Sequence, residues 1–212
     1  MQSDPRLAFC LADCPPGTSD ESLLECASGY FCVGGNSNAT ACPKGEFQSE
    51  RRATSCEDCH DGSYCGEGYS APTPCPAGRY APLPKLEDVD GCAPCELGHY
   101  CEAGSANFTA AIERVRLGLT NTTLMASCEA GRFGANNSLI DYKCSGKCEP
   151  GYYCPTGSTS GRERACPSGT FNPKAQLASP DQCEVCDVGY YCPEAATRPE
   201  PCARYSSAGA NA

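Results

Sequence analysis

The stretch Cys56–Tyr80, CEDCHDGSYCGEGYSAPTPCPAGRY, carries the pattern that decides the fold of this chain. Its skeleton is C-x2-C-x2-G-x-Y-C-x9-C-P-x-G-x-Y. Further copies are CAPCELGHYC from Cys92, CSGKCEPGYYC from Cys144, CEVCDVGYYC from Cys183 and an imperfect CASGYFC from Cys26. A four-cysteine phrase that returns along a chain indicates a tandem array of small modules.

The composition agrees with a disulfide scaffold. The 212 residues include 21 Cys, 22 Gly and 18 Pro, but no Trp and only 2 Met. A cysteine content near one tenth is typical of disulfide-stabilised proteins. Repeats of roughly 36 residues are too small for burial alone to support a fold, so disulfides must replace the missing core. Because disulfides persist in oxidising compartments, we expect an extracellular or cell-surface protein.

The cysteine that follows an aromatic residue gives the register of the array. Naming the cysteines of a repeat first to fourth, these third cysteines are Cys32, Cys65, Cys101, Cys154 and Cys192. The predicted domains are an atypical first repeat over 1–55, repeats over 56–91, 92–143 (with an insertion over 105–126) and 144–182, and a truncated last repeat over 183–212. Since Pro and Gly interrupt every apolar run, we expect small disulfide-rich modules, mostly irregular with short β-hairpins, in an elongated, rod-like tandem array.

Glycine and aromatic residues keep fixed offsets from the cysteines. A glycine stands three residues before each third cysteine, at 29, 62, 98, 151 and 189, and another three residues after most fourth cysteines, at 17, 45, 78, 131 and 169. An aromatic residue precedes each third cysteine. Glycine at a fixed offset predicts a turn with positive φ or a close approach of two chain segments. The rings can cover the disulfides as a miniature core.

Two disulfide schemes fit the four cysteines of a repeat. The interleaved scheme pairs first with third and second with fourth, for example Cys56–Cys65 and Cys59–Cys75. The sequential scheme pairs each fourth cysteine with the next first, and second with third. Spacing alone does not settle connectivity, but we favour the sequential scheme because it leaves only Cys202 unpaired. Its pairs are Cys10–Cys14, Cys26–Cys32, Cys42–Cys56, Cys59–Cys65, Cys75–Cys92, Cys95–Cys101, Cys128–Cys144, Cys148–Cys154, Cys166–Cys183 and Cys186–Cys192.

The insertion over 105–126 is the longest departure from the repeat. A short helix capped by Thr109 fits its apolar spacing, and so does an edge strand with alternating apolar and polar residues. We favour a strand or extended structure because Gly118 and the nearby Asn and Thr residues weaken a helix. Its apolar residues form a candidate contact surface for a neighbouring chain. They are Ile112, Val115, Leu117 and Leu119.

Sequons and charge bear on the environment and the partners. Four N-x-[ST] sequons predict N-linked glycans at Asn38, Asn107, Asn121 and Asn136. The N-terminus lacks an apolar signal core and no run approaches transmembrane length, so we expect a mature form or a piece of a longer protein, without membrane insertion in this segment. The net charge of -10 argues against nucleic acid and anionic membranes as partners.

No motif indicates catalysis, a cofactor or a metal. The C-x-x-C phrases lack the βαβ context of a redox centre, and their wide separation disfavours a four-thiolate zinc site. His60 and His99 have no recurring catalytic partner. The segment Leu86–Gly91, LEDVDG, lacks the acidic spacing of an EF-hand calcium loop. We therefore expect no enzyme, no cofactor and no metal site.

The recurring phrases C-x-x-C-P-x-G-x-[YF]-C and C-P-x-G-x-[YF] resemble those of ephrin-receptor-like and epidermal-growth-factor-like cysteine-rich repeats. The resemblance covers nearly the whole chain apart from 1–9 and 105–126. The half-repeat from C-P-x-G-x-Y to the next C-x-x-C is also similar to the first loop of tumour necrosis factor receptor modules. In those modules that cysteine pair is bridged, which agrees with the sequential scheme.

Arrays of this kind are common in large surface proteins of protists and algae, including mastigoneme (flagellar hair) proteins and the cysteine-repeat modular proteins of apicomplexan parasites. The resemblance implies an extended, glycosylated rod that acts as a fibre, spacer or adhesive ectodomain. Our first hypothesis is a structural segment of an extracellular filament or surface appendage, whose partners are copies of itself or other filament proteins. The alternative is a receptor or adhesin ectodomain that binds a protein ligand.

Overall fold

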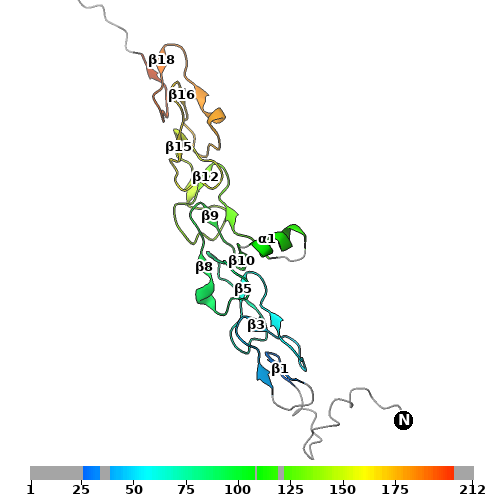
Figure 1. Cartoon of the computed structure of the whole chain (residues 1–212). Helices are drawn as coiled ribbons and strands as arrows, with labels where there is room; N and C mark the ends of the chain where they lie inside the picture. The colour runs from blue at the N-terminus through cyan, green and yellow to red at the C-terminus, as the bar shows by residue number, and fades with distance from the viewer. Residues whose placement is uncertain (1–25, 34–38, 108, 119–121, 203–212) are drawn as a thin grey trace, which may run out of the picture. The chain divides into compact units, whose positions relative to one another are not determined.

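The computed structural model describes residues 26–33, 39–107, 109–118 and 122–202 (Figure 1). By its contacts the chain divides into two compact units. One unit comprises Met1–Pro94 and Cys101–Met125, and the other Cys95–Tyr100 and Ala126–Ala212. Within both units the secondary structure is a succession of strands of two or three residues, held in small separate sheets.

Two kinds of antiparallel hairpin alternate along the chain. In the first kind, the strand before a third cysteine pairs with the strand before the following fourth cysteine. These pairs are β1(Tyr30–Phe31) with β2(Thr40–Ala41), β5(Ser63–Tyr64) with β6(Thr73–Pro74), β9(His99–Tyr100) with β11(Ala126–Ser127), β14(Tyr152–Tyr153) with β15(Arg164–Ala165), and β18(Tyr190–Tyr191) with β19(Glu200–Pro201). The strands are short because Cys, Pro and Gly bound each of them.

In the second kind, the strand after a fourth cysteine pairs with the strand after the next first cysteine. These pairs are β3(Glu46–Phe47) with β4(Glu57–Asp58), β7(Arg79–Ala81) with β8(Ala93–Pro94), β12(Arg132–Phe133) with β13(Gly146–Lys147), and β16(Thr170–Phe171) with β17(Glu184–Val185). Short 3-10 turns, η3(Val89–Gly91) and η4(Pro180–Gln182), precede β8 and β17. The prediction of small disulfide-rich modules, mostly irregular with short β-hairpins, is confirmed.

The insertion contains a helix, so the prediction of a strand or extended structure over this segment is wrong. Helix α1 covers Thr109–Arg116, between β10(Ser105–Ala106) and β11. Gly118 lies just beyond it with φ +69°, and its N–H donates to the carbonyl oxygen of Val115 at 3.0 Å. A glycine with positive φ at this position ends a helix and satisfies one of its last carbonyls. Gly118 therefore terminates α1 instead of disrupting it.

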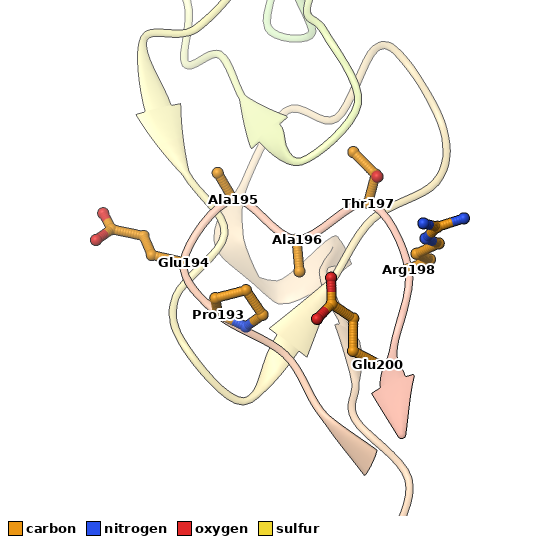
Figure 2. Close-up of a pocket in the computed structure, with 7 residues that line it drawn as sticks. All are labelled: Pro193, Glu194, Ala195, Ala196, Thr197, Arg198 and Glu200. Atoms are coloured by element: carbon orange, nitrogen blue, oxygen red, sulfur yellow. The ribbon is translucent and has the colours of Figure 1, made fainter. Parts of the chain in front are cut away.

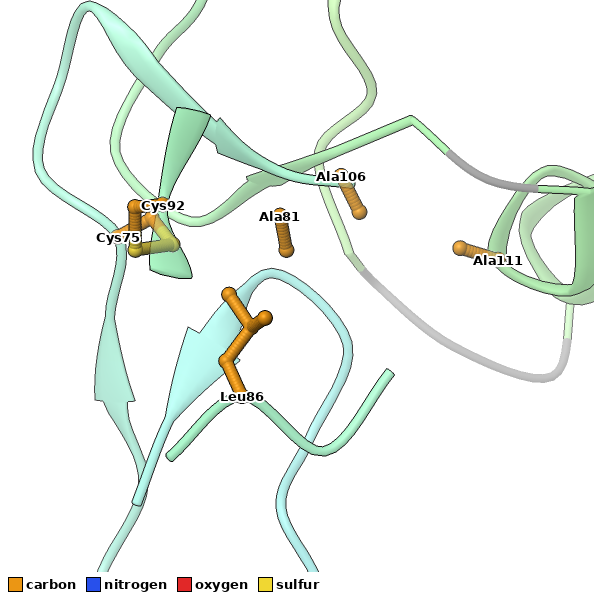
Figure 3. Close-up of a cluster of buried hydrophobic side chains, with 6 residues drawn as sticks. All are labelled: Cys75, Ala81, Leu86, Cys92, Ala106 and Ala111. Carbon is orange, nitrogen blue, oxygen red and sulfur yellow. A yellow bond between two sulfur atoms is a disulfide. The ribbon is translucent and has the colours of Figure 1, made fainter. Parts of the chain in front are cut away.

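Helix α1 is anchored by a small side chain and an ion pair. Ala111 is fully buried in a cluster with Ala81 and Ala106, and the three methyl groups lie close together in Figure 3. Arg114 extends to Asp61, with 2.6 Å between guanidinium nitrogen and carboxylate oxygen. Because alanine side chains are small, the backbone of α1 can approach the backbones at Ala81 and Ala106 closely. We infer that this close packing favours a helix at this position. Periodicity within the insertion contains no information about this contact.

The buried cores are small and are built around disulfides. In one cluster Phe47 packs on Cys59 and Cys65. In another Leu177 packs on Cys166 and Cys183. In a third, Leu86 packs on Cys75 and Cys92 (Figure 3). The tyrosine that precedes a third cysteine completes each of the last two clusters, because Tyr153 packs on the Leu177 cluster and Tyr64 on the Leu86 cluster. Single parallel bridges join the same two residue pairs.

Consecutive repeats meet through a close backbone contact at the glycine three residues before the third cysteine, here called the turn glycine. A Cβ atom on Gly62 would lie 1.9 Å from the carbonyl oxygen of Gly104, which stands three residues after the next third cysteine. The distances for the corresponding pairs Gly29–Gly68, Gly98–Gly157 and Gly151–Ala195 are 2.2, 2.2 and 2.3 Å. No side chain fits at such distances, so the contact requires glycine.

The contact between Gly98 and Gly157 allows a test with a matched control. Gly98 and Gly157 have nearly equal φ angles, +74° and +77°, but a Cβ on Gly157 would meet nothing within 4 Å. We expect Gly157→Ala to lower the free energy of unfolding by about 1 kcal/mol, the cost of an L side chain at positive φ. Gly98→Ala carries that cost plus overpacking, so we expect a loss of about 3 kcal/mol or more. Guanidinium denaturation with intact disulfides measures both, and equal losses would contradict the proposed contact.

Candidate functional site

The disulfides are the chemical groups that recur in every repeat. Cys95 and Cys101, which the sequence predicts to pair, are each disulfide-bonded. The thiol of Cys202 is free and exposed. Cys10 and Cys14 lie outside the described residues. The structure joins Cys26–Cys32, Cys42–Cys56, Cys59–Cys65, Cys75–Cys92, Cys128–Cys144, Cys148–Cys154, Cys166–Cys183 and Cys186–Cys192. These pairs are those of the sequential scheme, and the structure has neither Cys56–Cys65 nor Cys59–Cys75.

Four fourth cysteines among the described residues, Cys42, Cys75, Cys128 and Cys166, are each bonded to neighbouring segments at three points. Cys75 is bonded through sulfur to Cys92, its N–H donates to the carbonyl of Gly62 at 2.9 Å, and its own carbonyl accepts from the N–H of Gly104 at 2.8 Å. Gly62 lies in the same repeat as Cys75, thirteen residues before it, and Gly104 lies in the following repeat. The fourth cysteine is thus the point where three successive segments of the array meet.

Three other fourth cysteines in the described part of the chain have the same arrangement. The N–H groups of Cys42, Cys128 and Cys166 donate to Gly29, Gly98 and Gly151, and their carbonyls accept from Gly68, Gly157 and Ala195, all at 2.8–3.0 Å. Ala195 takes the place of glycine with φ +61°. The sequence analysis missed this second position, although the phrase C-x-x-G after the third cysteine carried the signal. It also missed the leucine eleven residues after two of the fourth cysteines, Leu86 and Leu177.

The structure places two of the four predicted glycosylation sites. Asn136 is exposed and stands two residues before Ser138, whose φ is +64°. Asn107 is half-buried, and its N–H donates to the carbonyl of Ala81 at 3.0 Å. Asn38 and Asn121 lie outside the described residues. Attachment of glycans at these sites stays a prediction.

The candidate contact surface of the insertion is partly exposed. Ile112 is 43% and Leu117 61% exposed, while Val115 is half-buried. Leu119 lies outside the described residues. The two exposed aliphatic side chains lie on and just after α1, which is otherwise attached through Ala111 and Arg114.

The histidines and the acidic turn have local contacts. The ring of His60 lies edge-on to Phe47, with 5.0 Å between centroids, and Nδ1 of His99 lies 2.9 Å from the carbonyl oxygen of Leu97. In the LEDVDG segment Asp88 accepts from the N–H groups of Asp90 and Gly91 and so caps η3. Within the part of the chain that the structure describes, no group of three or more His, Cys, Asp or Glu side chains is placed to hold a metal ion.

Ion pairs lie on the surface of the hairpins. Lys85 contacts Asp58 at 2.6 Å and Glu46 at 3.8 Å, across the β3–β4 hairpin. The hydrogen bond to Asp58 raises the pKa of Lys85 above its ordinary value. Similarly, the hydrogen bond from Tyr191 to Glu200 raises the pKa of Tyr191. These groups are exposed to solvent, so the pairs orient the hairpin surface and contribute little to stability.

A shallow hollow of about 380 Å³ lies in the loop after the third cysteine of the last repeat. It is lined by Pro193, Glu194, Ala195, Ala196, Thr197, Arg198 and Glu200. Figure 2 shows Glu194 and Arg198 pointing outward on opposite sides of this loop, while the carboxylate of Glu200 lies beside Ala196. Catalysis requires polar groups that converge on one reacting atom. This hollow does not provide such a group of side chains.

No protein-family model matches the chain, and no curated protein matches it. The many disulfides indicate a secreted or extracellular, disulfide-stabilised protein, because such bonds do not persist in the reducing cytosol. Among the described residues, no helix is long and apolar enough to cross a membrane.

The pairing can be tested at one cysteine. In the sequential scheme Cys92→Ala frees the thiol of Cys75, whereas the interleaved scheme would free Cys101. We expect iodoacetamide labelling and peptide mass spectrometry of this variant to find the new label on Cys75. Loss of the bridge should lower the free energy of unfolding by about 3 kcal/mol. The control Cys202→Ala removes an exposed free thiol and should change stability by less than about 0.5 kcal/mol. A new label on Cys101 would contradict the structure.

Proposed function

We propose that this chain is a structural segment of an extracellular, N-glycosylated filament or surface appendage, such as a flagellar hair. Its partners are copies of itself or other filament proteins, and its role is mechanical, without a catalytic step or a cofactor. The observation that carries the proposal is the three-way attachment of each fourth cysteine. Repeats linked in this way contact chiefly their sequence neighbours, which supports an extended array.

The mechanical argument follows from where the bonds lie. The disulfide Cys166–Cys183 closes a hairpin whose strands are only two residues long. On its own such a hairpin is marginal in water. A disulfide that closes a loop of this size contributes about 3 kcal/mol in the chain-entropy model. A pulling force therefore meets a covalent loop in each repeat before it can unravel the strands, which limits extension and protects the backbone from proteases.

Glycans would support the same role. Asn136 is exposed in the loop that precedes the first cysteine of the following repeat segment, Cys144. A glycan is bulky and hydrophilic, so at this position it would keep one side of the array soluble. The negative charge of the chain, -10 overall, acts in the same direction.

A receptor or adhesin ectodomain is the second candidate, and one observation favours it. Helix α1 interrupts an otherwise regular array and exposes Ile112 and Leu117. Exposed apolar side chains on a protruding element are typical of contacts with another protein. Under this alternative, Ile112→Asp combined with Leu117→Asp abolishes binding to that protein. Under the filament proposal the same double variant still assembles.

Electron microscopy tests the filament proposal. We expect the purified chain, secreted with intact disulfides, to form regular fibres in negative stain without any added partner. Reduced and alkylated protein should form none, because the repeats cannot fold without their bridges. A chain that stays monomeric at all concentrations, while binding a protein ligand, would support the receptor alternative instead.

Glycosylation can be tested by two neighbouring asparagines. Asn136 and Asn137 are both exposed, and only Asn136 heads the sequon N-N-S. In a eukaryotic secretory host we expect Asn136→Gln to remove one N-linked glycan, measured by mass before and after glycosidase treatment. Asn137→Gln keeps the sequon intact as N-Q-S and should retain the glycan. Equal masses of the two variants would show that Asn136 is not modified.

A further inference from the structure

One disulfide between a fourth cysteine and the next first cysteine lies beside an irregular strand pair. The first and second cysteines are separated by two residues in CEDC, CAPC and CEVC, but by three in CSGKC. In three hairpins the residue directly after the first cysteine pairs with an aromatic residue, in the pairs Phe47↔Glu57, Tyr80↔Ala93 and Phe171↔Glu184. In the fourth hairpin Phe133 pairs with Gly146, two residues after Cys144, and also accepts from the N–H of Ser145. Ser145 is therefore the extra residue of a one-residue bulge.

The bulge coincides with an unusual backbone conformation at Cys144. The φ angle of Cys144 is +53°, and no other cysteine among the described residues has a positive φ. Its counterparts Cys92 and Cys183 have φ angles of -74° and -72°. The left-handed region is unfavourable for an L-amino acid other than glycine. In the oxidised chain Cys144 is held there between the bulge and its bond to Cys128, and reduction of that bond would allow the backbone to relax.

A thiol can approach this disulfide from the side of Cys144. Cys144 is half-buried, whereas Cys128 is fully buried. Among the counterparts of Cys144, Cys92 and Cys183 are buried, and Cys56 is half-buried. Described repeats precede and follow Cys144 in the chain, so the ends of the array do not account for its exposure.

The charges around Cys144 also differ in sign from those around its counterparts. Within three residues on either side, Lys143 and Lys147 outnumber Asp141. The guanidinium group of Arg132 is nearby, because it donates to the carbonyl oxygen of Lys143 at 2.9 Å. Around the counterparts the same window has only acidic charges, namely Glu57 and Asp58, Asp90, and Asp181 and Glu184. Cationic neighbours attract an attacking thiolate and stabilise a departing one.

We propose that Cys128–Cys144 is a redox-sensitive bond, the first to be reduced by a small thiol among the four disulfides that join a fourth cysteine to the next first cysteine. Strained or exposed disulfides are more easily reduced than relaxed, buried ones. The strain in question is that of the backbone at Cys144. The inference goes beyond the proposed function and applies equally to a filament segment and to a receptor ectodomain.

The reaction is an ordinary thiol–disulfide exchange with a low-molecular-weight thiol such as glutathione. The thiolate attacks Sγ of Cys144, a new S–S bond forms, and the bond to Sγ of Cys128 breaks. Cys128 leaves as a thiolate and takes up a proton. A second thiolate then attacks the reagent sulfur of the mixed disulfide and releases Cys144. Two small thiols are thereby oxidised to one disulfide, and Cys128–Cys144 is reduced to two protein thiols.

Reduction would loosen the β12–β13 hairpin and its contact with the following segment. The two strands have two residues each, and such a pair is marginal without its disulfide. The hairpin also positions Gly131, whose N–H donates to the carbonyl of Cys154 at 2.7 Å. A Cβ atom on Gly131 would lie 2.6 Å from the carbonyl oxygen of Gln176. We therefore expect faster amide hydrogen exchange over 131–147 after selective reduction, with no change over 45–58.

Differential alkylation of the full chain tests the proposal. Cys202 is first blocked with N-ethylmaleimide, the protein is treated with dilute glutathione, and new thiols are trapped with isotope-labelled maleimide and quantified by peptide mass spectrometry. We expect Cys128–Cys144 to be reduced about tenfold faster, or more, than Cys42–Cys56. The second disulfide is the matched control, because Cys56 is also half-buried but lacks a positive φ and has acidic neighbours. Equal rates, or faster reduction of Cys42–Cys56, would overturn the proposal.

Two variants test the two causes separately. Removal of Ser145 restores the C-x-x-C spacing and should slow reduction about threefold or more with any thiol. Lys143→Glu combined with Lys147→Glu should slow reduction by anionic glutathione more than reduction by neutral 2-mercaptoethanol. Peptide mapping of Cys148–Cys154 checks that each variant folds. Unchanged rates in the folded variants would overturn the proposal, and the comparison within the natural chain decides it if the deletion does not fold.

Discussion

The attachment of each fourth cysteine to three segments is the constraint on which the structure depends. Its sulfur bonds the next first cysteine, its N–H bonds the preceding turn glycine, and its carbonyl accepts from the repeat that follows. The disulfide fixes the hairpin covalently, while the two backbone hydrogen bonds fix its neighbours. Without these three bonds a strand pair of two residues would have to hold itself together, which such a pair does poorly in water.

This constraint explains why so little apolar surface suffices. Each of the described clusters combines a disulfide, one leucine or phenylalanine, and a tyrosine. Because each of these clusters contains residues from two adjacent repeats, none of these cores is completed by one repeat alone. Cooperation between adjacent repeats is the usual condition of repeat proteins.

The insertion is the one place where the array changes its surface. Helix α1 sits on Ala81 and Ala106 through Ala111 and is tied to the preceding repeat by Arg114 and Asp61. The repeat that carries it still makes the ordinary contact of Gly62 with Gly104. This pair of consecutive repeats thus accommodates the inserted helix without losing the backbone contact between them.

Much of the architecture was predictable from the sequence, because disulfides and turns with positive φ require cysteine and glycine at regular spacings. Cysteine spacing and parity pointed to the sequential pairs, and glycines at fixed offsets predicted the turns with positive φ. The helix was not predictable, because Ala111 is buried in a cluster with Ala81, which lies far from it in the sequence, and because Gly118 can either weaken a helix or end it. By itself the sequence determined a stapled array of small hairpin modules. Only the tertiary structure decided that turn glycines lie under the carbonyls of the next repeat, since sequence offsets do not say which segments touch.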